Sequence, residues 1–198
     1  MLLLIVGLVI FIAIHLVPTL PDLRRGLAER FGEGAYKAAF SIISILGFAL
    51  IVLGYHKLQV NPGKNVVLFD PPEWTRHVAY LLMLPAMILL VAANVPSRIR
   101  TMVRHPMLAA VKLWALAHLI ANGDLASFIL FGSFLAYAVY DRISVKTRQA
   151  LGPLGDRNGS PLNDVIVVAA GLALYAFMIL LGHGVLIGVP LSQVSLAP

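Results

Sequence analysis

Cysteine is absent from the 198-residue sequence. Its absence excludes disulfide bonds, thiolate ligation of haem iron, cysteine-held iron–sulfur clusters and cysteine nucleophiles. Charged residues are also scarce, at 12% of the chain, whereas a soluble domain has roughly 25%. The alternation of polar and apolar residues that is typical of barrel strands is missing too. The composition therefore favours a helical membrane protein over a soluble enzyme.

Several catalytic motifs are missing as well. None of the six histidines forms H-x-x-x-H or H-E-x-x-H, so a zinc hydrolase has no local motif. No Ser-His-Asp arrangement, pair of carboxylates or glycine-rich phosphate loop can be recognised. We interpret Asp124 as a helix cap and Asp141 as an interfacial partner of Arg142, rather than as acid–base groups.

Hydrophobic residues make up 60% of the chain, and the mean hydropathy is +0.89. They gather in long runs, and about 20 apolar residues are enough to span a bilayer as a helix. The sequence predicts an all-α, polytopic integral membrane bundle of about six transmembrane helices, in a single domain over residues 1–198. Its surroundings would be the lipid bilayer, and the last eight residues would form a loose tail. The six segments are 2–17, 35–55, 77–93, 106–121, 124–140 and 164–181.

Basic residues are distributed unevenly between the loops. Six spans place the first, third and fifth loops on one side of the membrane. That side has eleven basic residues, whereas the other side has three. Such an excess marks the cytoplasmic side, so both termini would be exterior, or periplasmic in a bacterial inner membrane. This topology explains the net charge of +6, and we expect no nucleic-acid binding. The eleven are Arg24, Arg25, Arg30, Lys37, Arg98, Arg100, Arg104, Arg142, Lys146, Arg148 and Arg157; the three are Lys57, Lys64 and Arg76.

Small residues predict where helices approach one another closely. Six positions in two segments are expected to mark contact faces. In the second segment we expect Gly47 and the alanines Ala35, Ala38 and Ala39 at such faces, and in the sixth Gly171 and Ala176.

Two segments are predicted to form an antiparallel helical hairpin. The Arg-His-Pro sequence at 104–106 is typical of a helix start, because proline is tolerated where no amide donor is needed. The Asn-Gly-Asp sequence at 122–124 predicts a tight turn, and Asp124 can cap the following helix. The hairpin would consist of residues 106–121 and 124–140.

His15 and His118 are the two histidines embedded in apolar segments. At about 1.5 Å per residue, His118 lies roughly 19 Å from the cytoplasmic side and His15 at most about 13 Å. Ionisable groups in membrane helices are costly and usually functional. Two imidazoles at such depths suit the axial ligands of a tilted haem, although each ring could instead hydrogen-bond a neighbouring helix. Trp114, one turn before His118, would then pack on the porphyrin edge or simply fill the core.

The remaining histidines are placed nearer to the membrane surfaces. His105 is expected near the cytoplasmic surface, which makes it a weaker candidate for a ligand. His56, His77 and His183 fall near the exterior surface, as interfacial or loop residues.

Several sequence words resemble the NnrU family. They are R-H-P-M at 104–107, L-W-A-L-A-H at 113–118, N-G-D at 122–124, F-G at 131–132 and F-D-P-P-E-W at 69–74. This family is named for a membrane protein associated with nitrite and nitric oxide reductase expression, and it includes the 15-cis-zeta-carotene isomerase, a haem b enzyme. The resemblance implies haem b held by His15 and His118, in a redox-active protein or one that supports nitrite and nitric oxide metabolism, with a redox partner. Ala115 stands where the isomerase has a cysteine, so no thiolate can replace histidine here.

Two other classes of function stay open. One is a membrane enzyme with an apolar small-molecule substrate, either a carotenoid-type isomerase or a methyltransferase. Arg-His-Pro is similar to the Arg-His-Pro-x-Tyr word of isoprenylcysteine methyltransferase-like enzymes, which would place Arg104 and His105 at an S-adenosylmethionine site. Leu108 occupies the position of that tyrosine. The other class is a non-catalytic assembly or transport partner.

Overall fold

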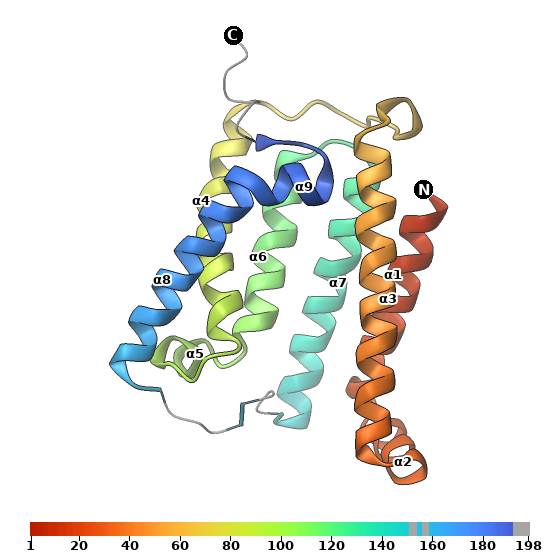
Figure 1. The fold of residues 1–198 in the computed structure, drawn as a ribbon, viewed down its shortest axis with the longest axis vertical. Helices are drawn as coiled ribbons and strands as arrows, with labels where there is room; N and C mark the ends of the chain where they lie inside the picture. The colour runs from red at the N-terminus through yellow and green to blue at the C-terminus, as the bar shows by residue number, and fades with distance from the viewer. Residues whose placement is uncertain (151–153, 156–158, 192–198) are drawn as a thin grey trace. The chain divides into compact units, whose positions relative to one another are not determined.

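The computed structural model describes residues 1–150, 154–155 and 159–191, except for the side chain of Pro62. The described part of the chain is predominantly helical (Figure 1). Five of its helices are long and apolar enough to cross a membrane, and a sixth apolar helix covers Pro106–Ala121. The predicted all-α polytopic bundle is therefore confirmed. The chain divides into two compact units, Met1–Val66 and Val67–Pro198.

The first unit is built on a pair of helices that pack against each other. They are α1 (Leu2–Leu16) and α3 (Glu33–Gln59), joined through η1 (Val17–Thr19) and α2 (Pro21–Phe31) and followed by η2 (Pro62–Lys64). Two glycines of α3 allow the close approach. A Cβ on Gly54 would lie 2.5 Å from the Leu4 nitrogen, and one on Gly47 would lie 2.8 Å from the Phe11 nitrogen.

The predicted contact faces are therefore right for the glycines and wrong for the alanines. Gly47 and Gly171 are both buried, and a Cβ on Gly171 would lie 2.6 Å from the Ile88 Cα. All four alanines are exposed, because only the glycines lie on the faces where two backbones meet. These alanines are Ala35, Ala38, Ala39 and Ala176.

The described residues of the second unit form four long helices and two short ones. In it α4 packs against both α6 and α8, α6 also packs against α7, and α5 contacts α4, α6 and α8 (Figure 1). The elements are α4 (Trp74–Ala92), α5 (Arg98–Val103), α6 (Pro106–Ala121), α7 (Leu125–Arg148), α8 (Pro161–Phe177), the π-helical turn η3 (Met178–Gly182) and α9 (His183–Ile187).

The α6–α7 hairpin forms as the sequence predicts. Pro106 opens α6, and Asp124 caps α7 by accepting a hydrogen bond from the Ser127 N–H at 2.9 Å. The turn is tied to the preceding loop, because the N–H groups of Leu68 and Phe69 both donate to the Gly123 carbonyl, at 2.7 and 3.1 Å. A Cβ on Gly123 would lie 1.9 Å from the Phe69 oxygen, so this position requires glycine.

Three predicted boundaries are wrong. Helix α7 continues to Arg148 instead of ending at 140, so Arg142, Lys146 and Arg148 belong to a helix and not to a loop. The third loop of the predicted topology, between the segments 77–93 and 106–121, contains α5, whose first turn is capped by Ser97. The sixth segment begins at Pro161 and continues through η3 into α9. Arg157 and most of the expected tail, at 192–198, lie outside the described residues.

Candidate functional site

His118 lies in the last turn of α6 and its tautomer is fixed by the backbone. Its Nδ1 is 2.8 Å from the Trp114 carbonyl oxygen. A carbonyl oxygen can only accept, so Nδ1 carries the hydrogen, and in the neutral ring Nε2 carries the lone pair. The ring thus has its Nε2 in the form that binds a metal ion.

Aromatic side chains of α6 and α7 lie next to this imidazole. Phe131 stacks on His118 with the ring centroids 4.4 Å apart, and Trp114 lies 5.5 Å from the same imidazole. Trp114 also makes edge contacts with Phe131 at 4.9 Å and with Phe134 at 5.3 Å. We call Trp114, His118, Phe131 and Phe134 the aromatic cluster. In the described structure Trp114 fills core between α6 and α7, which is one of its two predicted roles.

His183 of α9 adds a further ring next to the aromatic cluster. Its ring centroid is 5.9 Å from that of His118, and the two ring planes are 14° from parallel. His183 is half-buried at the first position of α9. The expectation of a loop residue at His183 is therefore wrong, because this residue belongs to a helix.

The π-helical turn η3 explains how His183 reaches this position. In an uninterrupted α-helix, His183 would follow the buried Gly171 by about 120° around the axis. One additional residue in a π turn returns it to within about 20° of Gly171. Val185, which the uninterrupted register would bury, is instead 75% exposed. Such turns are frequent at functional sites.

His15 has the same local geometry in the first unit. Its Nδ1 is 2.7 Å from the Phe11 carbonyl oxygen, so Nδ1 again carries the hydrogen. The Phe11 ring stacks on the imidazole at 4.0 Å, and Phe40 of α3 meets it edge-on at 5.1 Å. His15 and His118 belong to different units, so the pairing of their imidazoles at one haem stays a prediction.

Arg104 and His105 lie at the other end of α6. They precede His118 by 14 and 13 residues, or about 20 Å along a helix axis, so they cannot contact the same iron. Arg104 has φ 63° and ψ −46°, and the His105 N–H donates to the Val103 carbonyl at 2.8 Å. This geometry is a strained γ-turn, which joins α5 to α6. The Arg-His-Pro word thus has a structural role in the chain reversal.

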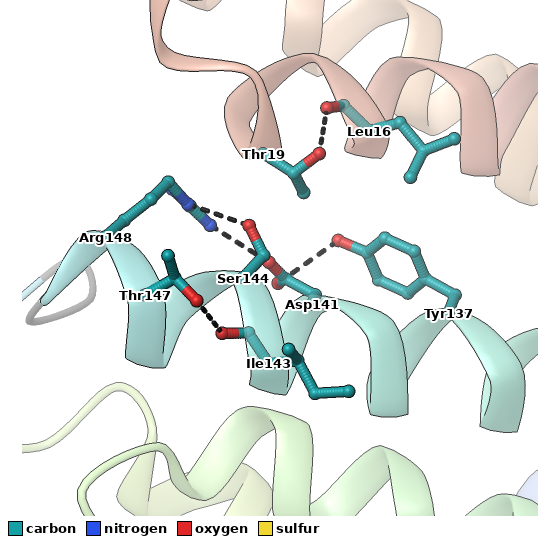
Figure 2. A network of polar contacts seen from close by, with 8 residues as sticks. All are labelled: Leu16, Thr19, Tyr137, Asp141, Ile143, Ser144, Thr147 and Arg148. Carbon is teal, nitrogen blue, oxygen red and sulfur yellow. Dashed lines mark hydrogen bonds and ion pairs between the residues drawn. The ribbon is translucent and has the colours of Figure 1, made fainter.

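A polar network closes the last turns of α7. Figure 2 shows Arg148 reaching back to Asp141, at 3.0 Å, and to the Ser144 hydroxyl, which accepts from Nε at 3.0 Å. The Tyr137 hydroxyl donates to Asp141 at 3.4 Å. The expected ion pair between Asp141 and Arg142 is therefore wrong, since Arg148 is the partner.

The pKa of His105 depends on burial and on the charged side chains near this end of the second unit. Burial lowers the pKa of His105, and the positive charge of Arg142 lowers it further. Arg100 and Arg104 act in the same direction, whereas Asp141 opposes them. The neutral imidazole is thus favoured where basic side chains gather.

No group of three or more histidine, aspartate or glutamate side chains within the described residues could hold a metal ion. A tetrahedral zinc site needs at least three such ligands. Haem iron needs only one or two axial ligands. His15 and His118, whose Nδ1 atoms carry the hydrogen, each have the ring form that an axial ligand of haem requires.

Helices of this length and hydropathy define an integral membrane protein. A family model described as NnrU protein matches residues 3–191, and the chain belongs to the NnrU family. No curated protein and no solved structure matches the chain. The family suggested by the sequence words is thus confirmed over nearly the whole chain.

Proposed function

We propose that the chain binds haem b through His15 and His118. The observation that carries the proposal is the shared tautomer of the two rings: each donates Nδ1–H to the carbonyl four residues earlier, which leaves the lone pair on Nε2. A hydrogen bond from the second ring nitrogen orients a ligating histidine and raises its basicity. Membership of the NnrU family adds to the proposal.

The surrounding side chains would hold the two imidazoles in place and keep water away. Phe131 stacks on His118, and Phe11 stacks on His15. Haem b bound by two histidines would supply one-electron redox chemistry. We infer that the protein works with a redox partner or supports nitrite and nitric oxide metabolism, and this second inference rests on family membership alone.

The alternative function that uses the same cofactor is that of an isomerase acting on an apolar substrate. Ala115, which occupies the position of the cysteine in the isomerase, is fully buried and cannot exchange with histidine as a ligand. The methyltransferase alternative is weaker, because the γ-turn accounts for Arg104 and Pro106 without a cofactor. Binding of S-adenosylmethionine by haem-free protein would reverse this order.

The test is the haem content of the purified protein and of single histidine variants. We expect membrane-extracted protein to be red and to give a haem b haemochrome spectrum. His15→Ala and His118→Ala should each lose haem or its low-spin spectrum. His77→Ala is the matched control, because His77 is exposed at the start of α4, and it should resemble wild type. Retention of the wild-type spectrum in both of the first two variants would overturn the assignment.

A further inference from the structure

Two basic side chains at the end of α7 lack an acidic counterpart. Arg142 and Lys146 follow Asp141, the only acidic residue of α7, and Asp141 is bonded to Arg148. Among the described residues, no carboxylate forms an ion pair with Arg142 or Lys146. Their charges are therefore available to an anion from outside the chain.

These two side chains line one surface cleft. The cleft has a volume of about 620 Å³ and is lined by Arg142, Ile143, Lys146 and Thr147. Residues four apart lie above one another on a helix, so the two cations form one row and Ile143 and Thr147 form the next. Ile143 is 63% exposed, and the Thr147 hydroxyl donates to the Ile143 carbonyl at 3.1 Å. The cleft thus offers a cationic row beside an apolar one.

The charge at this end of the unit is positive beyond the cleft itself. Burial lowers the pKa of His105 most, and the positive charges of Arg142, Arg100 and Arg104 lower it further, against the opposing effect of Asp141. A phosphate placed among them would be attracted by several charges at once.

The position of the cleft selects a lipid as the source of the phosphate. Helix α7 has 24 residues, or about 36 Å, which is longer than the roughly 30 Å hydrocarbon core of a bilayer. Its last turns therefore reach headgroup level, and the predicted topology puts them on the cytoplasmic side, where basic pockets bind anionic lipids. An exposed isoleucine beside the cations suits the glycerol and upper acyl carbons of a lipid better than a hydrated ion.

We propose that the cleft on α7 binds an anionic phospholipid, with Arg142 and Lys146 on the phosphate and Ile143 along the glycerol and first acyl carbons. The lipid would fix the end of α7 at the membrane surface. This inference stands apart from haem binding, because the aromatic cluster lies toward the opposite end of the helix.

The test measures lipid binding by the full chain in detergent, with or without haem. Phosphatidylglycerol and phosphatidylcholine of the same acyl chains are titrated, and bound lipid is counted by native mass spectrometry. We expect phosphatidylglycerol to bind more tightly than phosphatidylcholine. The double variant Arg142→Gln/Lys146→Gln should bind phosphatidylglycerol roughly 30-fold more weakly than wild type, at about fivefold per charge. The matched control, Lys57→Gln/Lys64→Gln, removes the same charge elsewhere and should bind as wild type does.

A third variant distinguishes the loss of charge from a disturbance of the helix. Arg142→Lys/Lys146→Arg keeps both charges and should retain binding to within a few-fold, whereas a merely disturbed helix would not. Equal affinity of wild type and Arg142→Gln/Lys146→Gln for phosphatidylglycerol would overturn the proposal, as would equal loss in the control variant. Competition by millimolar inorganic phosphate as effective as the lipid itself would show that the lipid is the wrong source.

Discussion

The ring centroids of His118 and His183 lie 5.9 Å apart, with the two planes 14° from parallel. The residues are far apart in the sequence, yet the end of α6 and the start of α9 bring them together. Phe131 stacks on His118 as well, so this imidazole has ring neighbours from both α7 and α9. A substitution at His183 should therefore change the packing around the His118 imidazole.

The first prediction concerns this histidine pair. We expect His183→Ala to keep haem bound but to shift the electron paramagnetic resonance signal and the visible bands, because removal of a neighbouring ring loosens the His118 imidazole and admits water. His183→Phe should restore the packing and move the spectrum back toward wild type. His77→Ala serves as the control, and spectra of His183→Ala identical to it would contradict a role for His183 at the site.

The second prediction concerns the γ-turn at Arg104. A non-glycine residue with this backbone conformation costs on the order of 1–3 kcal/mol. We expect Arg104→Gly to raise the free energy of unfolding by about 1 kcal/mol, because glycine relieves the strain but adds freedom to the unfolded chain. Arg98→Gly, in the exposed first turn of α5, should instead lower it by about 0.5–1 kcal/mol. Thermal melts in detergent compare them, and a fall for Arg104→Gly would mean that the arginine side chain is needed there.

The third prediction concerns acid sensitivity. The folded-state pKa of His105 is lowered by burial and then by Arg142, Arg100 and Arg104, against the opposing effect of Asp141. Below the ordinary histidine pKa of about 6.5, the unfolded state therefore binds more protons than the folded state. The stabilising contribution of neutral His105 is complete above that pH and is lost as the pH falls toward the lowered folded-state pKa.

Protonation of His105 should therefore make the folded protein less stable to heat. The melting temperature should fall between about pH 7.5 and about pH 5.5, and it should fall less in Arg142→Gln because one cause of the lowered pKa is removed. His105→Gln should remove the contribution altogether. Lys64→Gln, which changes the net charge equally, is expected to keep the wild-type slope. An unchanged slope in His105→Gln would show that other groups account for the acid effect.

The hairpin could be predicted from the sequence because its signals are local. Pro106 opens a helix through its fixed φ, and Asp124 caps one through a side chain three residues from its donor. His15 and His118 could be selected because an imidazole in an apolar run needs a partner. In both cases the residues that decide the structure lie within one helical turn of one another.

His183 was missed because its position depends on a π turn. A histidine that follows Leu180, Leu181 and Gly182 is typical of the end of a membrane span. A π turn adds one residue to a helical turn, and the amino-acid composition does not indicate it. The choice of Arg148 over Arg142 by Asp141 was missed for a related reason. It requires α7 to continue past 140, whereas the charges there indicate a loop. The sequence at the end of a helix that extends beyond the bilayer is polar, as the sequence of a loop is. The continuation of the helix can be recognised only from the structure.

The last prediction uses two glycines of α3 that differ in their surroundings. A Cβ at Gly47 would lie 2.8 Å from the Phe11 nitrogen and 3.0 Å from its Cα, whereas a Cβ at Gly34 would meet nothing within 4 Å. Gly47→Ala must therefore push α1 and α3 apart and should lower the free energy of unfolding by about 1–3 kcal/mol. Gly47→Leu should lower it further.

Gly34→Ala is the matched control, since it adds the same methyl group to the same helix. Alanine has a higher helix propensity than glycine, so this variant should be neutral or more stable by up to about 1 kcal/mol. Thermal melts in one detergent would compare these three variants with the wild type. Because His15 lies four residues after Phe11 and donates to its carbonyl, the separation of α1 from α3 should also disturb haem in Gly47→Ala but not in Gly34→Ala. Wild-type stability in Gly47→Ala would show that α1 and α3 do not meet at this glycine.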